Sequence, residues 1–205
     1  MNTGLEEIKV FLSCPEDIVK NGIKDVIERV FEEDNIYFKN YFRLIFELKH
    51  WKKNVYLGKG TPRVQDVINE KLIKDCDIFL QVLWTRFGSP PGVTTDGINY
   101  SSGTEEEFHF AKKFDKKLWI LFYTKPVPPL SIDPSQLEKI QKFREQLKKE
   151  QIRYYKFSNE NELRKVLKEN MSNFINEKYS IKIKEKENIQ TLPSKADFSK
   201  YSRGF

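Results

Sequence analysis

The chain has 205 residues, of which 39% are hydrophobic and 32% charged, and its 16 Phe, 9 Tyr and 3 Trp exclude disorder for most of its length. No run approaches the ~18 apolar residues of a membrane span. Residues 1–7 have neither a basic start nor an apolar stretch, so we expect no signal peptide. Two cysteines, Cys14 and Cys76, and two histidines, His50 and His109, give neither a disulfide framework nor a zinc-binding spacing. We therefore expect a cytoplasmic protein without a metal site or membrane partner.

The net charge is +6, and about half of the excess lies at the C-terminal end. Residues 180–205 hold six Lys or Arg against three Asp or Glu, with Pro193 and few apolar side chains. Lys and Glu are interspersed elsewhere, as on a solvated surface, so direct nucleic-acid binding is not favoured. We expect an α/β domain over residues 1–179 and a basic, linker-like tail over residues 180–205.

Apolar runs alternate with amphipathic helical patterns along the chain. The runs predict strands over residues 8–13, 42–51, 76–84, 118–123 and 152–157. The patterns predict helices from residue 16 past residue 30, from 62 past 72, and over 104–114, 134–149 and 160–179.

This alternation predicts a doubly wound α/β fold with a five-stranded parallel sheet. Several of the strands are almost continuously apolar, as expected when helices cover both faces of the sheet. Right-handed crossovers then give a flavodoxin-like three-layer sandwich. Ligands bind such sheets beyond the carboxyl ends of the strands, so we expect the site to follow Leu12, Trp51 and Trp84.

One carboxylate within the run SSGTEEEFHFA, residues 101–111, lacks a purely structural explanation. Ser102 and Glu105 have capping-box spacing, which accounts for Glu105. Glu107 instead falls on an apolar stripe with Phe110, Ala111 and Phe114. We interpret Glu107 as a candidate catalytic group or a solvated rim residue, with Glu106, off the stripe, as the control.

Other candidates lie at strand ends. Ser13 is placed to donate a hydrogen bond to a ligand or to form an ordinary turn. Trp84 and Arg86 can hold a base and a phosphate or carboxylate, or serve packing and a surface ion pair. For Cys14 and for His109 we favour a packed or exposed side chain over a catalytic one.

Several segments together resemble TIR-like domains, relatives of Toll/interleukin-1 receptor domains found in bacterial anti-phage proteins and at the start of STAND NTPases. They are, in order, residues 11–17 (FLSCPED), 65–70 (QDVINE), 77–79 (DIF), 84–90 (WTRFGSP) and 102–108 (SGTEEEF). The resemblance covers about residues 8–123, and more loosely continues to residue 179.

The resemblance implies an NAD+ glycohydrolase effector in anti-phage immunity. Catalytically active TIR-like domains cleave the nicotinamide–ribose bond with a glutamate four residues before a small residue, the place that Glu107 occupies relative to Ala111. Ser13, Trp84, Arg86 and the loop of residues 52–62 would line the cleft. NAD+ would be a substrate rather than a resident cofactor. Activity would need self-association, with an NTPase or sensor module in cis or in trans.

Two other interpretations remain open. The first is a non-catalytic TIR-like oligomerisation or adaptor module. The second is an N-glycosidase similar to nucleoside 2-deoxyribosyltransferases, which would also place a glutamate beside a ribose.

Overall fold

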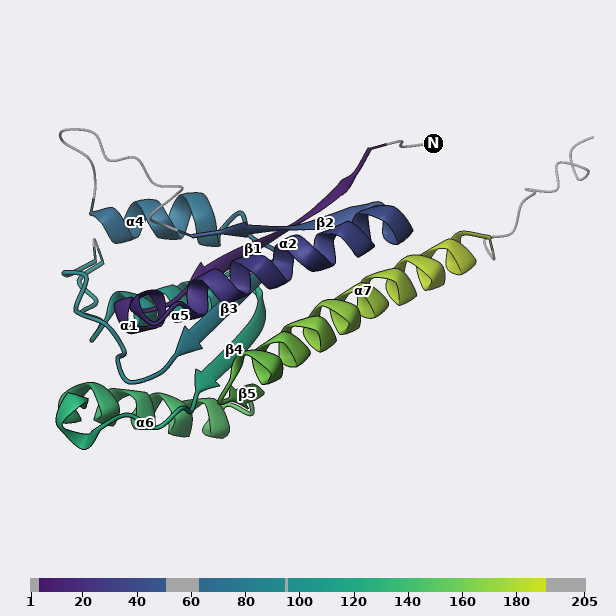
Figure 1. Cartoon of the computed structure of the whole chain (residues 1–205). Helices are drawn as coiled ribbons and strands as arrows, with labels where there is room; N and C mark the ends of the chain where they lie inside the picture. Colours follow the sequence, from purple (N-terminus) through teal and green to yellow (C-terminus); the bar gives the residue numbers. More distant parts are fainter. Residues whose placement is uncertain (1–3, 51–62, 95, 191–205) are drawn as a thin grey trace, which may run out of the picture. The chain divides into compact units, whose positions relative to one another are not determined.

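The computed structural model describes residues 4–50, 63–94 and 96–190, with the side chains of residues 181–190 excepted. The chain divides into two units, residues 1–167 and residues 168–205. The first unit contains the whole sheet (Figure 1). Its strands are β1 (Glu6–Ser13), β2 (Leu44–Lys49), β3 (Ile78–Leu83), β4 (Lys117–Tyr123) and β5 (Tyr154–Phe157).

All four strand pairings are parallel, and the strand order is β2-β1-β3-β4-β5. This order is flavodoxin-like and confirms the predicted fold class. The order of strands reverses between β1 and β3, where Ser13 pairs with Gln81. A crevice forms at such a switch point because the connections leave the two strands toward opposite faces of the sheet.

Helices connect the strands in the predicted alternation. They are α1 (Glu16–Lys20), α2 (Ile23–Phe42), α4 (Val64–Ile68), the π-helical turn η1 (Asn69–Ile73), α5 (Gly103–Lys113), the 3-10 turn η2 (Pro129–Ser131), α6 (Pro134–Lys149) and α7 (Glu160–Gln190).

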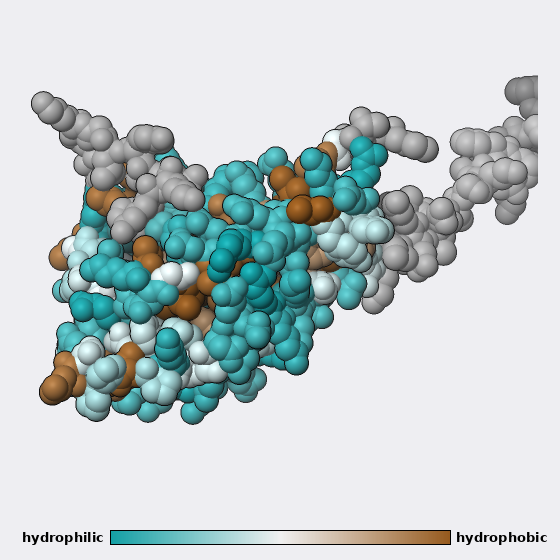
Figure 2. All heavy atoms as spheres, viewed as in Figure 1, coloured by the Kyte–Doolittle hydropathy of each residue, from teal (hydrophilic) through white to brown (hydrophobic). Residues whose placement is uncertain are grey.

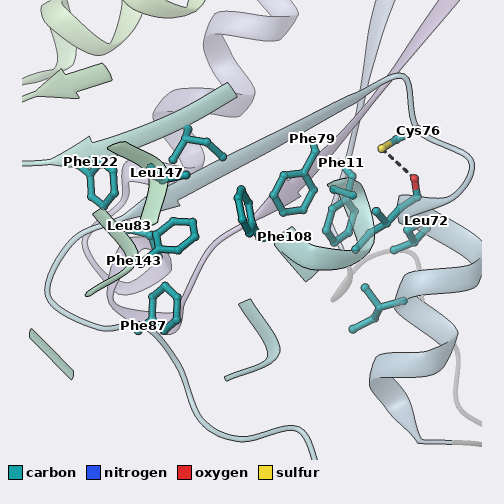
Figure 3. Packing of buried hydrophobic residues seen from close by; sticks show 14 of the residues in the cluster. Phe11, Leu72, Cys76, Phe79, Leu83, Phe87, Phe108, Phe122, Phe143 and Leu147 are labelled. Carbon is teal, nitrogen blue, oxygen red and sulfur yellow. Dashed lines mark hydrogen bonds between the residues drawn. The ribbon is translucent and has the colours of Figure 1, made fainter. Parts of the chain in front are cut away.

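One face of the sheet packs against α4, η1, α5 and α6. Aromatic side chains form the middle of this core (Figure 3). Phe108 of α5 meets Phe143 of α6 edge to face, with ring centroids 4.8 Å apart, and Phe11 of β1 stacks on Phe79 of β3. Phe108 is fully buried, so α5 is held firmly beside the ends of β1 and β3.

The other face of the sheet packs against α2. Phe46 of β2 contacts Phe31 and Phe38 of this helix and Trp119 of β4. Helices on both faces complete the three-layer sandwich. Figure 2 shows hydrophilic residues over most of the face in view, with hydrophobic residues in small separate groups. In the described part of the chain, none of the helices is long and apolar enough to cross a membrane.

The boundaries of three elements differ from the prediction. The first helical pattern divides at Gly22, whose φ of 71° is left-handed, and the second part continues to Phe42, so β2 starts at Leu44. The last helix continues beyond Tyr179 to Gln190. Its extension is rich in Lys and Glu, which have good helix propensity, and contains neither Gly nor Pro. Residues 191–205 of the predicted tail lie outside the described residues.

The turn at Gly22 generates a prediction for stability. An added Cβ would meet no heavy atom within 4 Å, so Gly22→Ala imposes only the cost of a left-handed backbone. We expect a loss of about 1 kcal/mol in the free energy of unfolding, measured with denaturant. Gly4→Ala is the control, because Gly4 also has open space but no positive φ. Equal unfolding curves for the two variants would contradict this account.

Candidate functional site

Glu107 lies at the end of β1, in a buried position on α5. Only 6% of the residue is exposed. Ser13 Oγ donates a hydrogen bond to Glu107 Oε2 at 2.5 Å, and Gln65 Nε2 donates to Oε1 at 3.1 Å. Three elements therefore meet at one carboxylate: the last residue of β1, the start of α4, and α5. Both donors are neutral, so no cation neutralises Glu107 in these contacts.

The electrostatics of this position favour a protonated carboxyl group. Burial raises the pKa of Glu107 from 4.5 to about 7, and the nearby carboxylate of Glu106 adds to the rise. The hydrogen bonds from Ser13 and Gln65 lower the pKa but do not outweigh burial. Glu107 therefore titrates close to neutral pH, and strongly shifted pKa values of this kind cluster at functional sites.

The neighbouring carboxylate, Glu106, has a different environment. Arg63 binds it through two hydrogen bonds, Nη2 to Oε1 at 2.6 Å and Nη1 to Oε2 at 2.9 Å. Asn69 Nδ2 donates to the same Oε1 at 2.8 Å. Only 3% of Glu106 is exposed, so a buried ion pair holds it in place. Glu106, which lies off the predicted apolar stripe and was expected to serve as the control, is therefore unsuitable for that purpose because its substitution would break this ion pair.

Amide side chains link the two carboxylates. Gln65 Nε2, besides contacting Glu107, approaches Asn69 Oδ1 at 3.3 Å, and Asn69 in turn binds Glu106. Gly103 allows this arrangement, because an added Cβ would lie 2.7 Å from Gln65 Oε1. Asn69 is the first residue of the π-helical turn η1, and π-helical turns are frequent at functional sites.

Two side chains, Asp17 and Gln136, fix the loop that follows β3. Asp17 Oδ2 accepts hydrogen bonds from Thr85 N at 2.9 Å and from Arg86 N at 3.1 Å. Gln136 Oε1 accepts from Phe87 N and Gly88 N. These contacts come from α1 and α6, so residues 85–88 have a defined position beside α5.

Two neighbouring cavities lie at this end of the sheet, and Glu107 lines the smaller one. The smaller has a volume of about 240 Å³, and its lining includes Glu107, Gln65 and Thr104. The larger has a volume of about 620 Å³, and its lining includes Lys20, His50 and Arg86. Cys14, Gly88 and Ser89 line both. Together they offer space in the range of small-molecule sites.

The structure brings together most of the residues that the sequence nominated. Ser13 contacts Glu107 directly, and Arg86 lines the larger cavity. Trp84 does not join them: its Nε1 donates to Lys125 O at 3.0 Å and its ring packs against Tyr123. Trp84 therefore packs against the C-terminal end of β4 and lines neither cavity. The loop of residues 52–62 lies outside the described residues.

The other residues of the motif have structural contacts. Ser102 Oγ accepts from Glu105 N at 3.0 Å, and Glu105 Oε2 reaches back to Ser101 N at 2.7 Å, so the capping interaction extends to one residue earlier than predicted. His109 is half-buried beside Tyr100, and burial lowers its pKa. The buried residues of α5 are Thr104, Glu106, Glu107, Phe108 and Ala111. Phe110 and Phe114 of the predicted apolar stripe are only half-buried.

Two residues of the site, Gln65 and His50, could not be found from the sequence pattern. Gln65 belonged to a recognised motif, yet nothing in its spacing pointed to Glu107. His50 follows β2 and is 3% exposed, and its Nε2 lies 3.8 Å from Cys14 Sγ. Only the parallel pairing of β1 with β2 brings these two residues together. Within residues 4–50, 63–94 and 96–190, no group of three or more His, Cys, Asp or Glu could hold a metal ion.

Chemically, the site combines one titratable carboxylate, a hydroxyl donor and a cation at the edge of an adjoining cavity. Such a set can bind sugar hydroxyls and stabilise a cationic centre.

A family model describes most of the chain. Residues 17–172 match the domain of unknown function DUF4062. The chain belongs to this family. The DUF4062 domain also resembles a solved structure of a conserved protein from Enterococcus faecalis V583, with a TM-score of 0.41 and 10% identity over 80% of this chain and 99% of that chain. No curated protein matches it.

The ion pair of Arg63 generates a stability prediction for the DUF4062 domain. Arg63→Met leaves the carboxylate of Glu106 buried without its cation, and we expect a loss of roughly 3 kcal/mol in the free energy of unfolding. The double variant with Glu106→Gln should lose less than the sum of the single variants, as a double-mutant cycle by denaturant unfolding measures.

Lys142→Met is the control, because Lys142 pairs with Glu138 on the surface, where both side chains are largely exposed. A loss no larger for Arg63→Met than for Lys142→Met would contradict the assigned role of the buried pair.

The raised pKa of Glu107 predicts how stability depends on pH. A carboxyl group whose pKa is higher in the folded state favours folding below its unfolded pKa and loses this contribution as pH rises through the folded value. A rise from 4.5 to about 7 corresponds to roughly 3 kcal/mol. Relative to wild type, Glu107→Gln should therefore gain about this much stability between about pH 4 and pH 8. Parallel pH curves for the two proteins, measured by denaturant unfolding, would rule out a raised pKa.

Proposed function

We propose that this DUF4062 domain is an NAD+ glycohydrolase that cleaves the nicotinamide–ribose bond with Glu107. The observation that carries the proposal is a buried carboxylate, with a pKa of about 7, that lines a cavity at the switch point of a parallel sheet. The resemblance of the sequence motifs to TIR-like domains supports the same residue and the same reaction.

The environment of Glu107 suits this reaction. As nicotinamide leaves, positive charge develops at the anomeric carbon and ring oxygen of the ribose, and a nearby carboxylate stabilises it. Burial strengthens this attraction because little water screens it. Ser13 and Gln65 fix the carboxylate oxygens without neutralising their charge. Water then adds to the ribose carbon to give ADP-ribose, or a hydroxyl or ring nitrogen of the same molecule adds to give a cyclic product.

The adjoining cavity provides for the rest of the substrate. Arg86 and Lys20 line it, and both are cations that can bind a pyrophosphate. The revised substrate-binding set is therefore Ser13 and Arg86 without Trp84. We further propose that activity depends on self-association and operates in bacterial anti-phage defence, with an NTPase or sensor module in cis or in trans.

The test is nicotinamide release from NAD+ by the purified chain at high concentration, with and without a crowding agent, followed by chromatography. Glu107→Gln should reduce the rate by at least roughly a hundred-fold, because it removes the charge that stabilises the transition state. Glu138→Gln is the matched control, since Glu138 is an exposed glutamate on α6.

Release that persists in Glu107→Gln would overturn the site assignment. Release from nucleosides but not from NAD+ would favour the deoxyribosyltransferase-like reaction at the same carboxylate. Absence of release from either substrate, with and without crowding, would count against an enzyme.

One observation favours the second candidate function, a non-catalytic oligomerisation module. Large apolar side chains are exposed toward the C-terminal end of α2, with Tyr41 at 73% and Ile36 at 66%. Exposed apolar surface of this kind occurs at protein interfaces. A module of this type would keep its concentration-dependent assembly in Glu107→Gln, as size-exclusion chromatography or light scattering would show.

A further inference from the structure

The two cysteines of the chain have very different surroundings. Cys76 is 3% exposed, its Sγ donates to Ile73 O at 3.1 Å, and burial raises the pKa of its thiol to about 11 (Figure 3). Cys14 is half-buried, follows the last residue of β1, and lines both cavities. A small reagent in either cavity can therefore reach Cys14 but not Cys76.

A histidine accompanies the accessible thiol. His50 Nε2 lies 3.8 Å from Cys14 Sγ, within the range of a hydrogen bond that involves sulfur. The parallel pairing of β1 with β2 sets this proximity, because Cys14 follows β1 and His50 follows β2 on the same edge. His50 is buried, so packing restricts its ring and keeps it beside the thiol.

A thiol beside an imidazole can transfer its proton and react as a thiolate. The charged groups that line the larger cavity, which Cys14 and His50 share, are two acids and two bases, Glu16, Asp17, Lys20 and Arg86. One of the acids, Asp17, already accepts hydrogen bonds from the backbone of Thr85 and Arg86. The lining therefore contains no excess of negative charge that would oppose a thiolate.

We propose that Cys14 and His50 form a reactive thiol site in the larger cavity, and that its reaction partner is a small disulfide. Cys14 Sγ passes its proton to His50 Nε2 and attacks one sulfur of the disulfide. The sulfur–sulfur bond of the reagent breaks, and a mixed disulfide forms on Cys14. The other half leaves as a thiolate and takes up the proton from His50. The disulfide is the oxidant, and no other reactant is needed.

The test uses the full chain with oxidised glutathione and, separately, iodoacetamide at neutral pH. Intact mass and peptide mapping follow the adducts. We expect one adduct, on Cys14, while Cys76 stays unmodified until the chain is denatured. Folded Cys14 should react roughly three-fold or more faster than Cys14 in the denatured Cys76→Ser chain, because the larger thiolate fraction outweighs the lower nucleophilicity of each thiolate.

His50→Gln tests the role of the imidazole. It should reduce the rate at Cys14 by roughly three-fold or more, and continued protection of Cys76 would show that the variant is folded. If His50→Gln fails to fold, the comparison of folded Cys14 with Cys14 in the denatured Cys76→Ser chain tests the proposal instead, because it needs no substitution at His50.

Adducts on both cysteines of the folded chain, or a rate at Cys14 no higher than in the denatured chain, would overturn the proposal. An unchanged rate in folded His50→Gln would also overturn it. Mass detects the adduct whether or not the chain cleaves NAD+, so failure here is distinguishable from failure of the glycohydrolase proposal.

Discussion

Two adjacent glutamates are buried in the first turns of α5, and the surrounding structure depends on how each is compensated. A buried carboxylate is costly unless hydrogen bonds or a cation stabilise its charge. The cationic guanidinium of Arg63 donates two hydrogen bonds to Glu106 and compensates its charge. Glu107 receives two neutral donors, Ser13 and Gln65. This difference assigns a structural role to the first carboxylate and leaves the second able to titrate near neutral pH.

The compensation of these charges also determines the local backbone. Arg63 donates to Gly92 O at 3.0 Å as well as to Glu106, so the loop after β3 is attached to the start of α4. Gln65 approaches α5 so closely that a Cβ at position 103 would lie 2.7 Å from Gln65 Oε1 and displace that side chain. Gln65 thus both binds Glu107 and lines the smaller cavity, and a change in one of these linked contacts should alter the others.

The sequence was sufficient for the sheet and for Glu107, but not for the partners of Glu107. Continuous apolar runs reflect burial on both faces, which is why the five strands and their parallel order could be predicted. Spacing on α5 isolated Glu107 because a helix has a fixed period. The same periodicity placed Glu106 off the stripe but could not show that Arg63, the residue before α4, buries it in an ion pair. Gln65 and His50 depend on contacts between segments distant in sequence, and no local pattern encodes them.

The neutral partners of Glu107 matter for what the carboxylate can do. A guanidinium in place of these neutral donors would stabilise the folded chain and lower the pKa of Glu107. It would also neutralise the negative charge that stabilises a cation during the reaction. Ser13 and Gln65 orient the oxygens and leave most of the negative charge available. Under the proposed function, the site gives up stability at neutral pH and gains an electrostatic interaction that a cationic ligand completes.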